Sequence, residues 1–97
     1  MAFVAVEYVY NPKNAQEMDR VRPAHREFLA SLFAEGKLVA SGPYTEGEVP
    51  GALLLLDAPD GAAALAVLEE DPFQRAGLLE EWRARAWNPV IGEFAGR

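Results

Sequence analysis

The feature that most constrains this chain is the apolar run Leu53-Leu54-Leu55-Leu56, which makes a strand apolar on both sides. Successive side chains of a strand point to opposite faces, and a sheet with one face in water alternates apolar with polar residues. The segment Phe3-Val4-Ala5-Val6 is continuous in the same way. We therefore expect helices over one face of the sheet and the same face of a second subunit over the other, giving a homodimer, with a dimer of dimers left open.

The remaining segments alternate between strand and helix patterns. Aromatic and β-branched residues predict strands, and the alanine-rich and amphipathic stretches predict helices. The last segment has good helix formers, yet its side chains alternate with a period of two, so we interpret it as a strand. The expected elements are a strand at 3–10, a helix at 23–35 after a loose lead-in at 14–22, strands at 37–41 and 52–58, a helix at 62–70 and a strand at 78–87.

This order, βαββαβ, predicts an α+β chain with a ferredoxin-like antiparallel sheet and both helices on one face. Pro23 suits the first turn of a helix, and Gly36 suits the left-handed residue after it. Asp60 can cap the second helix, and Asp71 before Pro72 should end it. Repeats and linkers are absent, so we expect a single domain over residues 1–97.

Composition excludes several functional classes. The chain has no cysteine, one histidine and a formal net charge of −6. A thiolate nucleophile and a cysteine or histidine metal cluster are therefore excluded, and nucleic-acid binding is disfavoured because it requires phosphate neutralisation. No apolar run is long enough to cross a bilayer, and the first residues lack the basic start of a signal peptide. We expect a cytoplasmic protein without a membrane partner.

His25 is the first candidate for chemistry. It falls on the same helix side as Leu29 and Leu32, at positions i, i+4 and i+7, and Arg22 lies one turn earlier. A titratable ring on a buried helix face is either a hydrogen-bonded core residue or part of a site. Spacing alone leaves both interpretations open, and it leaves Arg22 as either a surface ion pair or a clamp for a carboxylate or enolate.

Two further positions could complete a site with His25. Asp71 is constrained between a helix end and a proline, with Phe73 as an anchor into the core. If the carboxylate reached the imidazole, it would fix the tautomer and leave a better general base. The other position is Ser41-Gly42-Pro43, a strand end that is either an ordinary turn or a pocket rim with a hydroxyl and free N–H groups.

Taken together, these residues resemble the YciI-like (YCII) family. The resemblance rests on Arg22-x-x-His25, on Ser41-Gly42-Pro43 after the second strand, and most specifically on Asp71-Pro72-Phe73 followed by Ala76-Gly77-Leu78. With Gly36, Leu38 and Gly51, these anchors extend over nearly the whole chain. The family often has a proline before the aromatic residue that ends its last strand, whereas this chain has Ala86-Trp87.

The resemblance implies a dimeric α+β barrel and a catalytic pair formed by His25 and Asp71. Arg22, the Ser41-Gly42-Pro43 turn and Phe73 are then the candidate substrate contacts, with no metal and no organic cofactor. The family is associated with lyase-like and dehydrochlorinase-like chemistry, and its fold is similar to that of muconolactone isomerases and small cofactor-free oxygenases.

The leading hypothesis is a small enzyme in which His25, oriented by Asp71, moves a proton on a small cyclic or anionic metabolite. Elimination and isomerisation both fit this chemistry. Two alternatives stay open: a non-catalytic dimeric module that binds a small molecule or docks on an enzyme, and a cofactor-free oxygenase.

Overall fold

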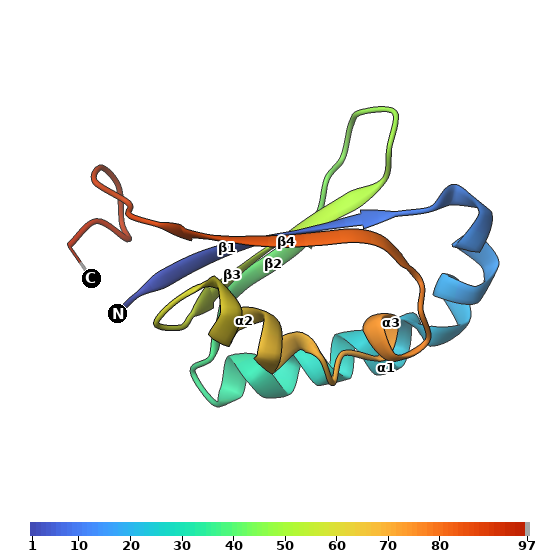
Figure 1. Cartoon of the computed structure of the whole chain (residues 1–97), viewed down its shortest axis with the longest axis horizontal. Helices are drawn as coiled ribbons and strands as arrows, with labels where there is room; N and C mark the ends of the chain where they lie inside the picture. Colours follow the sequence, from blue (N-terminus) through green and yellow to red (C-terminus); the bar gives the residue numbers. More distant parts are fainter. Residues whose placement is uncertain (97) are drawn as a thin grey trace.

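An antiparallel sheet of four strands organises the computed structural model, which describes residues 1–96 (Figure 1). The strand order is β2-β3-β1-β4, with β1 pairing antiparallel to both β3 and β4. The expected ferredoxin-like α+β order is confirmed. The strands are β1 (Phe3–Tyr10), β2 (Leu38–Pro43), β3 (Gly51–Asp57) and β4 (Leu79–Trp87), and the helices are η1 (Pro12–Asn14), α1 (Ala15–Ala34), α2 (Gly61–Leu68) and α3 (Pro72–Arg75).

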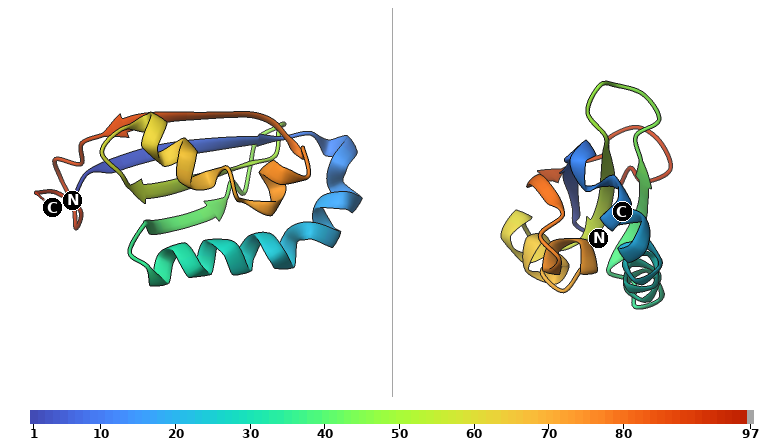
Figure 2. Two further views of the ribbon diagram at one scale, coloured as in Figure 1. Left: turned by 60° about the horizontal axis from the view of Figure 1, so that its bottom comes forward. Right: turned by 90° about the vertical axis from the view of Figure 1, so that its right-hand side faces the viewer.

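Helices α1, α2 and α3 lie on one face of the sheet, as two views show (Figures 1 and 2). Helix α1 packs beside β2 and against α3, while α2 packs on β1 and β4. The core lies between these helices and the sheet. Its fully buried side chains come from alternate positions of the two central strands and from the two later helices: Val4, Val6, Tyr8, Leu54, Leu56, Leu68 and Phe73.

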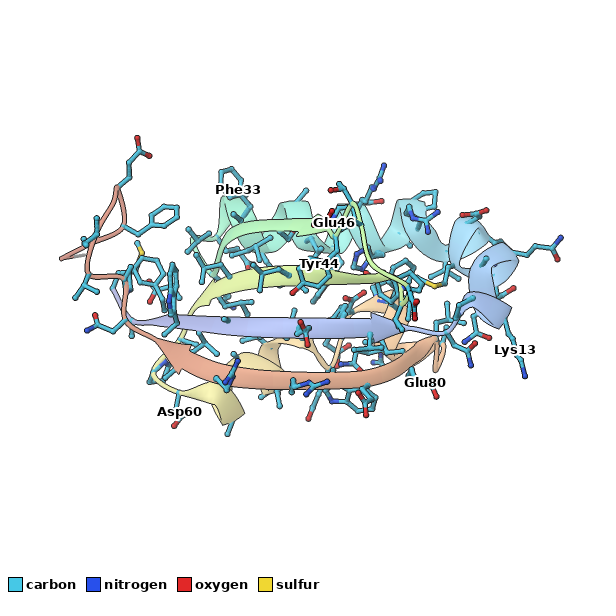
Figure 3. The ribbon with its side chains drawn as sticks, turned by 90° about the horizontal axis from the view of Figure 1, so that it is seen from above. Lys13, Phe33, Tyr44, Glu46, Asp60 and Glu80 are labelled. Carbon is cyan, nitrogen blue, oxygen red and sulfur yellow. The ribbon has the colours of Figure 1, made fainter. Side chains whose placement is uncertain are left out.

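The opposite face of the sheet carries no helix (Figure 3). Leu53 points to this face and is 45% exposed, whereas Leu54 and Leu56 are fully buried beneath the helices. The apolar run in β3 therefore has the two apolar sides that its sequence predicts. We call the helix-free side the outer face. The β2–β3 connection rises from it as a hairpin loop (Figure 1).

The prediction of a loose lead-in before Pro23 is wrong. Helix α1 begins at Ala15 and continues through Pro23 without ending. A proline inside a helix removes one backbone hydrogen bond, but packing can outweigh that cost. Met18 is buried in the core on the N-terminal half of this helix, and the ring of Pro23 is exposed to solvent.

The second helical segment is also corrected. Helix α2 ends at Leu68 rather than Glu70, and a separate short helix, α3, begins at Pro72. Asp71 is the N-cap of α3, since its side chain accepts a hydrogen bond from the Phe73 N–H. An aspartate followed by proline is a common helix start, so this signal was present in the sequence.

Other local predictions are confirmed. Asp60 caps α2 by accepting from the Ala63 N–H, and Gly36 has a φ of +80° after α1. The ambiguous last segment is a strand that remains paired as far as Trp87, opposite Phe3. Within residues 1–96, no helix is long and apolar enough to cross a membrane.

Candidate active site

His25 and Asp71 lie in contact although they are 46 positions apart in the chain. The imidazole Nδ1 of His25 is 2.7 Å from Asp71 Oδ1. His25 comes from the middle of α1, and Asp71 comes from the start of α3, which packs on α1. Asp71 is completely buried and His25 is 8% exposed. The sequence offered Asp71 as a possible partner of His25, the resemblance made that pairing specific, and the structure brings the two residues together.

Asp71 is surrounded by donors. Its Oδ2 accepts a 2.8 Å hydrogen bond from the Tyr8 hydroxyl, and its Oδ1 also accepts one of 3.0 Å from the Phe73 N–H. A carboxylate only accepts hydrogen bonds, so this set of partners fits the ionised acid. The remaining partner, His25 Nδ1, then carries a proton and donates it. In the neutral ring this leaves the lone pair on Nε2, the nitrogen that a general base uses.

Tyr8 is a member of this network that the sequence analysis missed. It is fully buried, and its pKa lies well above the usual range because of burial, then the charge of Asp71 and the hydrogen bond to it. The nearby Gln74 side chain opposes part of that shift in the pKa of Tyr8. Tyr8 is therefore a permanent donor to Asp71. A tyrosine on the buried side of a strand needs a partner for its hydroxyl, and that was the available signal.

Phe73 fixes the plane of the imidazole. The two rings are stacked with centroids 3.9 Å apart and planes only 8° apart. One face of His25 is thus covered by Phe73, and one edge is bonded to Asp71. Only the remaining edge of the ring, which carries Nε2, and its second face are left for a ligand.

His25 opens onto a cavity of about 280 Å³ between α1 and the β2 side of the sheet. All five candidate substrate contacts line it: Arg22, Ser41, Gly42, Pro43 and Phe73. Other lining residues, which the sequence did not single out, are Tyr10, Arg26, Leu29, Ala52 and Leu54. Two arginines and no carboxylate line this cavity, so it favours a small ligand with negative charge.

A β-bulge turns Ser41 toward this cavity. Leu38 pairs with Leu56, but Ala40 pairs with Leu55, so one extra residue lies between them in β2. Ser41 consequently lies opposite Leu54, whose side chain faces the helices. Without the extra residue Ser41 would lie opposite Leu53 and point to the outer face. Bulges are a common means of redirecting a side chain at a site.

A larger cavity, of about 630 Å³, lies on the outer face and does not include His25. It shares the Ser41–Pro43 segment with the smaller cavity, because β2 is an edge strand that both cavities reach. Its walls are otherwise mainly apolar, including Leu53, Leu55 and Trp87. Of these two cavities, only the smaller one is lined by the His25 imidazole and by the two arginines.

The described residues, 1–96, contain no group of three or more His, Cys, Asp or Glu side chains placed to hold a metal ion. The polar groups that do converge are one imidazole, a tyrosine hydroxyl, a serine hydroxyl and two guanidinium groups. Such a set can move a proton and bind an anion.

Solved structures with the same fold include three that cover most of this chain. The first is 5-chloro-2-hydroxyhydroquinone dehydrochlorinase (TftG) from Burkholderia phenoliruptrix AC1100, solved with 2,5-dihydroxybenzoquinone. It is 22% identical, has a TM-score of 0.75, and the match covers 89% of this chain and 93% of that one. At this identity the likeness establishes the fold alone.

The other two are more distant. An antibiotic biosynthesis monooxygenase is 17% identical, with a TM-score of 0.59 and coverage of 94% of this chain and 100% of that one. A NIPSNAP domain protein from Burkholderia xenovorans is 14% identical, with a TM-score of 0.58 and complete coverage of both chains. No curated protein matches the chain by sequence.

A family model matches most of the chain. The model of the YCII-related domain matches residues 1–88, which include every strand and helix of the structure and all the residues of the His25 cavity. The chain belongs to the YCII-related domain family.

Proposed function

We propose that this protein is a small enzyme in which His25 is the general acid/base and Asp71 orients it. The observation that carries the proposal is the 2.7 Å contact between the buried carboxylate of Asp71 and Nδ1 of His25, whose ring lines a cavity. A histidine that served only the core would need no opening to solvent and no arginines around it. General acid/base catalysis of this kind contributes roughly 10²–10⁴-fold to a rate.

The proposed step is a proton transfer at an activated carbon or hydroxyl group. Nε2 of His25 takes the proton, and the electron pair left behind moves onto a carbonyl oxygen to form an enolate. The enolate then expels a leaving group in an elimination, or it takes the proton back at another atom in an isomerisation. In the isomerisation the imidazolium returns its proton to the substrate. In the elimination it releases the proton to solvent, so that proton and expelled anion leave together as an acid. Neither route needs an oxidant or a reductant, so the proposed chemistry requires no metal and no organic cofactor.

We propose a small, cyclic, negatively charged substrate. The cavity of about 280 Å³ suits a single ring, and Arg22 and Arg26 supply positive charge beside it. Phe73, Ser41, Gly42 and Pro43 would bound the substrate on its other sides. The dehydrochlorinase of the same fold acts, by its name, on a chlorinated hydroxyhydroquinone, which supports this substrate class.

We further propose that residues 1–97 act as one YciI-like domain that forms a homodimer through the outer face, in the cytoplasm. Leu53 and Trp87 are 45% and 47% exposed there, beside the apolar cavity that they line with Leu55. Burying a leucine completely stabilises a structure by about 2 kcal/mol, and two-fold packing would bury these side chains twice. The dimer would also lie against the shared Ser41–Pro43 segment.

The test measures chloride release from 5-chloro-2-hydroxyhydroquinone and deuterium uptake by 2,5-dihydroxybenzoquinone in heavy water. We expect His25→Ala and His25→Gln to slow the reaction by about 10²–10⁴-fold. Glu27→Ala is the matched control, because Glu27 is exposed on the same helix and does not line the cavity. Circular dichroism verifies that each variant is folded.

Equal rates for the wild type and both His25 variants would contradict the proposal. Binding of the quinone by the wild type without any turnover would favour the alternative of a non-catalytic binding module.

A further inference from the structure

Of the three tyrosines, Tyr10 alone lines the cavity that contains His25. The hydroxyl of Tyr8 donates to Asp71 and that of Tyr44 donates to Glu7. Within residues 1–96, no such bond is formed by the hydroxyl of Tyr10, which lines the cavity beside His25.

The ring of Tyr10 is held in a fixed position. It meets Phe73 edge-to-face, with centroids 5.8 Å apart and planes at 82°, and it meets Tyr8 at 6.4 Å and 61°. Its backbone N–H donates a 2.9 Å hydrogen bond to the Pro50 carbonyl, which fixes the end of β1. Phe73 thus contacts both rings, stacking on His25 and meeting Tyr10 edge-to-face.

The electrostatic surroundings keep the Tyr10 hydroxyl protonated. Burial, followed by the charge of Asp71, raises the pKa of Tyr10 to about 12, and the guanidinium of Arg22 opposes the shift. Both charges are therefore close enough to act on the phenol. A protonated phenol is a hydrogen-bond donor, and Arg22 is a cation that lines the same cavity.

Arg22 is only partly occupied by protein contacts. Its Nη1 donates a hydrogen bond to Asp19 on the same helix. The side chain of Arg22 is about one-third exposed. A guanidinium has five N–H donors, so others remain available to a ligand. The cavity thus presents two donors, Tyr10 and Arg22, near a base, His25, and no carboxylate lines it.

We propose that the Tyr10 hydroxyl, together with Arg22, binds the negatively charged oxygen of an enolate or phenolate ligand, which makes Tyr10 a catalytic residue of this site. The proposal rests on the proposed function and specifies its ligand: a ring that carries an oxyanion beside the atom from which His25 takes the proton. Donors placed where charge develops stabilise it most in a site from which water is partly excluded.

The test compares binding of 4-nitrophenolate and its uncharged analogue 4-nitroanisole by wild type, Tyr10→Phe and Tyr44→Phe. Titrations use a pH at which the nitrophenol is ionised. We expect Tyr10→Phe to weaken phenolate binding by about 10-fold to 100-fold, the usual effect of a hydrogen bond to a charged group. Its affinity for 4-nitroanisole should hardly change. Tyr44→Phe is the matched control, since that hydroxyl bonds Glu7 outside the cavity.

Two results would overturn the inference: equal phenolate affinity of wild type and Tyr10→Phe, or the same loss for both ligands, which would indicate a packing role. Failure of wild type to bind the phenolate would overturn it as well. These results are distinct from a failure of the proposed function, which is decided by whether His25→Ala alters chloride release and deuterium uptake.

Discussion

At the scale of single residues, the site depends on the two oxygens of Asp71. Oδ1 accepts from the His25 ring and from the Phe73 N–H, and Oδ2 accepts from Tyr8. A fully buried carboxylate is tolerated only when its oxygens are satisfied. Each donor also has a structural role, since Tyr8 belongs to β1 and Phe73 to α3. The carboxylate therefore links the sheet and two helices at the point where His25 must be held.

Removing the Tyr8 hydroxyl should destabilise the protein. In Tyr8→Phe, Oδ2 of Asp71 loses its partner in a place that water does not reach, so we expect a cost of about 1–3 kcal/mol in the free energy of unfolding. Urea denaturation measures it. Tyr44→Phe is the control, because its hydroxyl bond to Glu7 is exposed and should contribute about 0.5 kcal/mol or less. Equal midpoints for the two variants would contradict the role given to Tyr8.

The tyrosines also predict how stability depends on alkaline pH. Free tyrosine ionises near pH 10, whereas burial and Asp71 raise the pKa of Tyr10 to about 12 and that of Tyr8 further. Above about pH 10 the unfolded chain loses protons that the native protein retains, so the free energy of unfolding should fall as pH rises. Below about pH 10 this contribution is fully present.

Urea denaturation at several pH values above neutrality measures that dependence. The double variant Tyr8→Phe/Tyr10→Phe should show a shallower fall than wild type, since it lacks both groups. An identical slope for the two proteins would show that these tyrosines are not the cause.

At the residue scale, part of the site could be predicted from local patterns and part only from a family resemblance. His25 and Arg22 followed from helical spacing. The constrained position of Asp71 made it a possible partner of His25, and the family resemblance made that pairing specific. Tyr8 and Tyr10 were treated only as strand-forming residues. Their roles depend on where β1 places their hydroxyls relative to α1 and α3, and no local pattern encodes that relation.

At the scale of elements, the sheet was predictable, whereas the start of α1 and the end of α2 were not. The strands follow from apolar runs bounded by glycine and proline, and β4 followed from a period of two. Helix α1 extends through Pro23 because Met18 and the later apolar residues pack on the sheet together. This tertiary contribution outweighs the local preference of proline. The bulge in β2 was likewise invisible to a pattern analysis, although it determines where Ser41 points.

The approach of β3 to β1 depends on a glycine. A Cβ at Gly51 would lie 2.4 Å from the backbone oxygen of Tyr8. We expect Gly51→Ala to separate the strands next to the site and to cost about 1–3 kcal/mol, the usual effect of overpacking. Gly42→Ala is the matched control for stability, because its Cβ would meet no atom within 4 Å. Thermal unfolding compares the two, and similar melting temperatures would contradict this prediction.

At the scale of the whole molecule, the outer face is the feature that a single subunit leaves unexplained. Its apolar part surrounds Leu53 and Trp87, and its charged part carries Glu7 and Arg83. The sequence predicted this face from the strand β3 alone. It could not predict the C-terminal segment beside it, where Phe94 packs on Phe3 after β4 ends.

We expect Leu53→Lys to convert the proposed dimer to a monomer, because a charge would then be buried in an apolar interface. Light scattering at micromolar concentration measures the mass. Phe33→Lys is the matched control, since Phe33 is also an exposed apolar residue but lies on α1, away from the outer face (Figure 3). A wild-type monomer, or a dimer retained by Leu53→Lys, would contradict the proposed arrangement.

The central claim is that Asp71 leaves the lone pair of His25 on Nε2, facing the cavity. Because His25 is the only histidine, a ¹⁵N NMR spectrum of the imidazole reports this ring alone. We expect a proton on Nδ1 and none on Nε2 in the neutral ring, and we expect the Nε2 signal to move when 4-nitrophenolate binds. A proton on Nε2 and a lone pair on Nδ1 would contradict it.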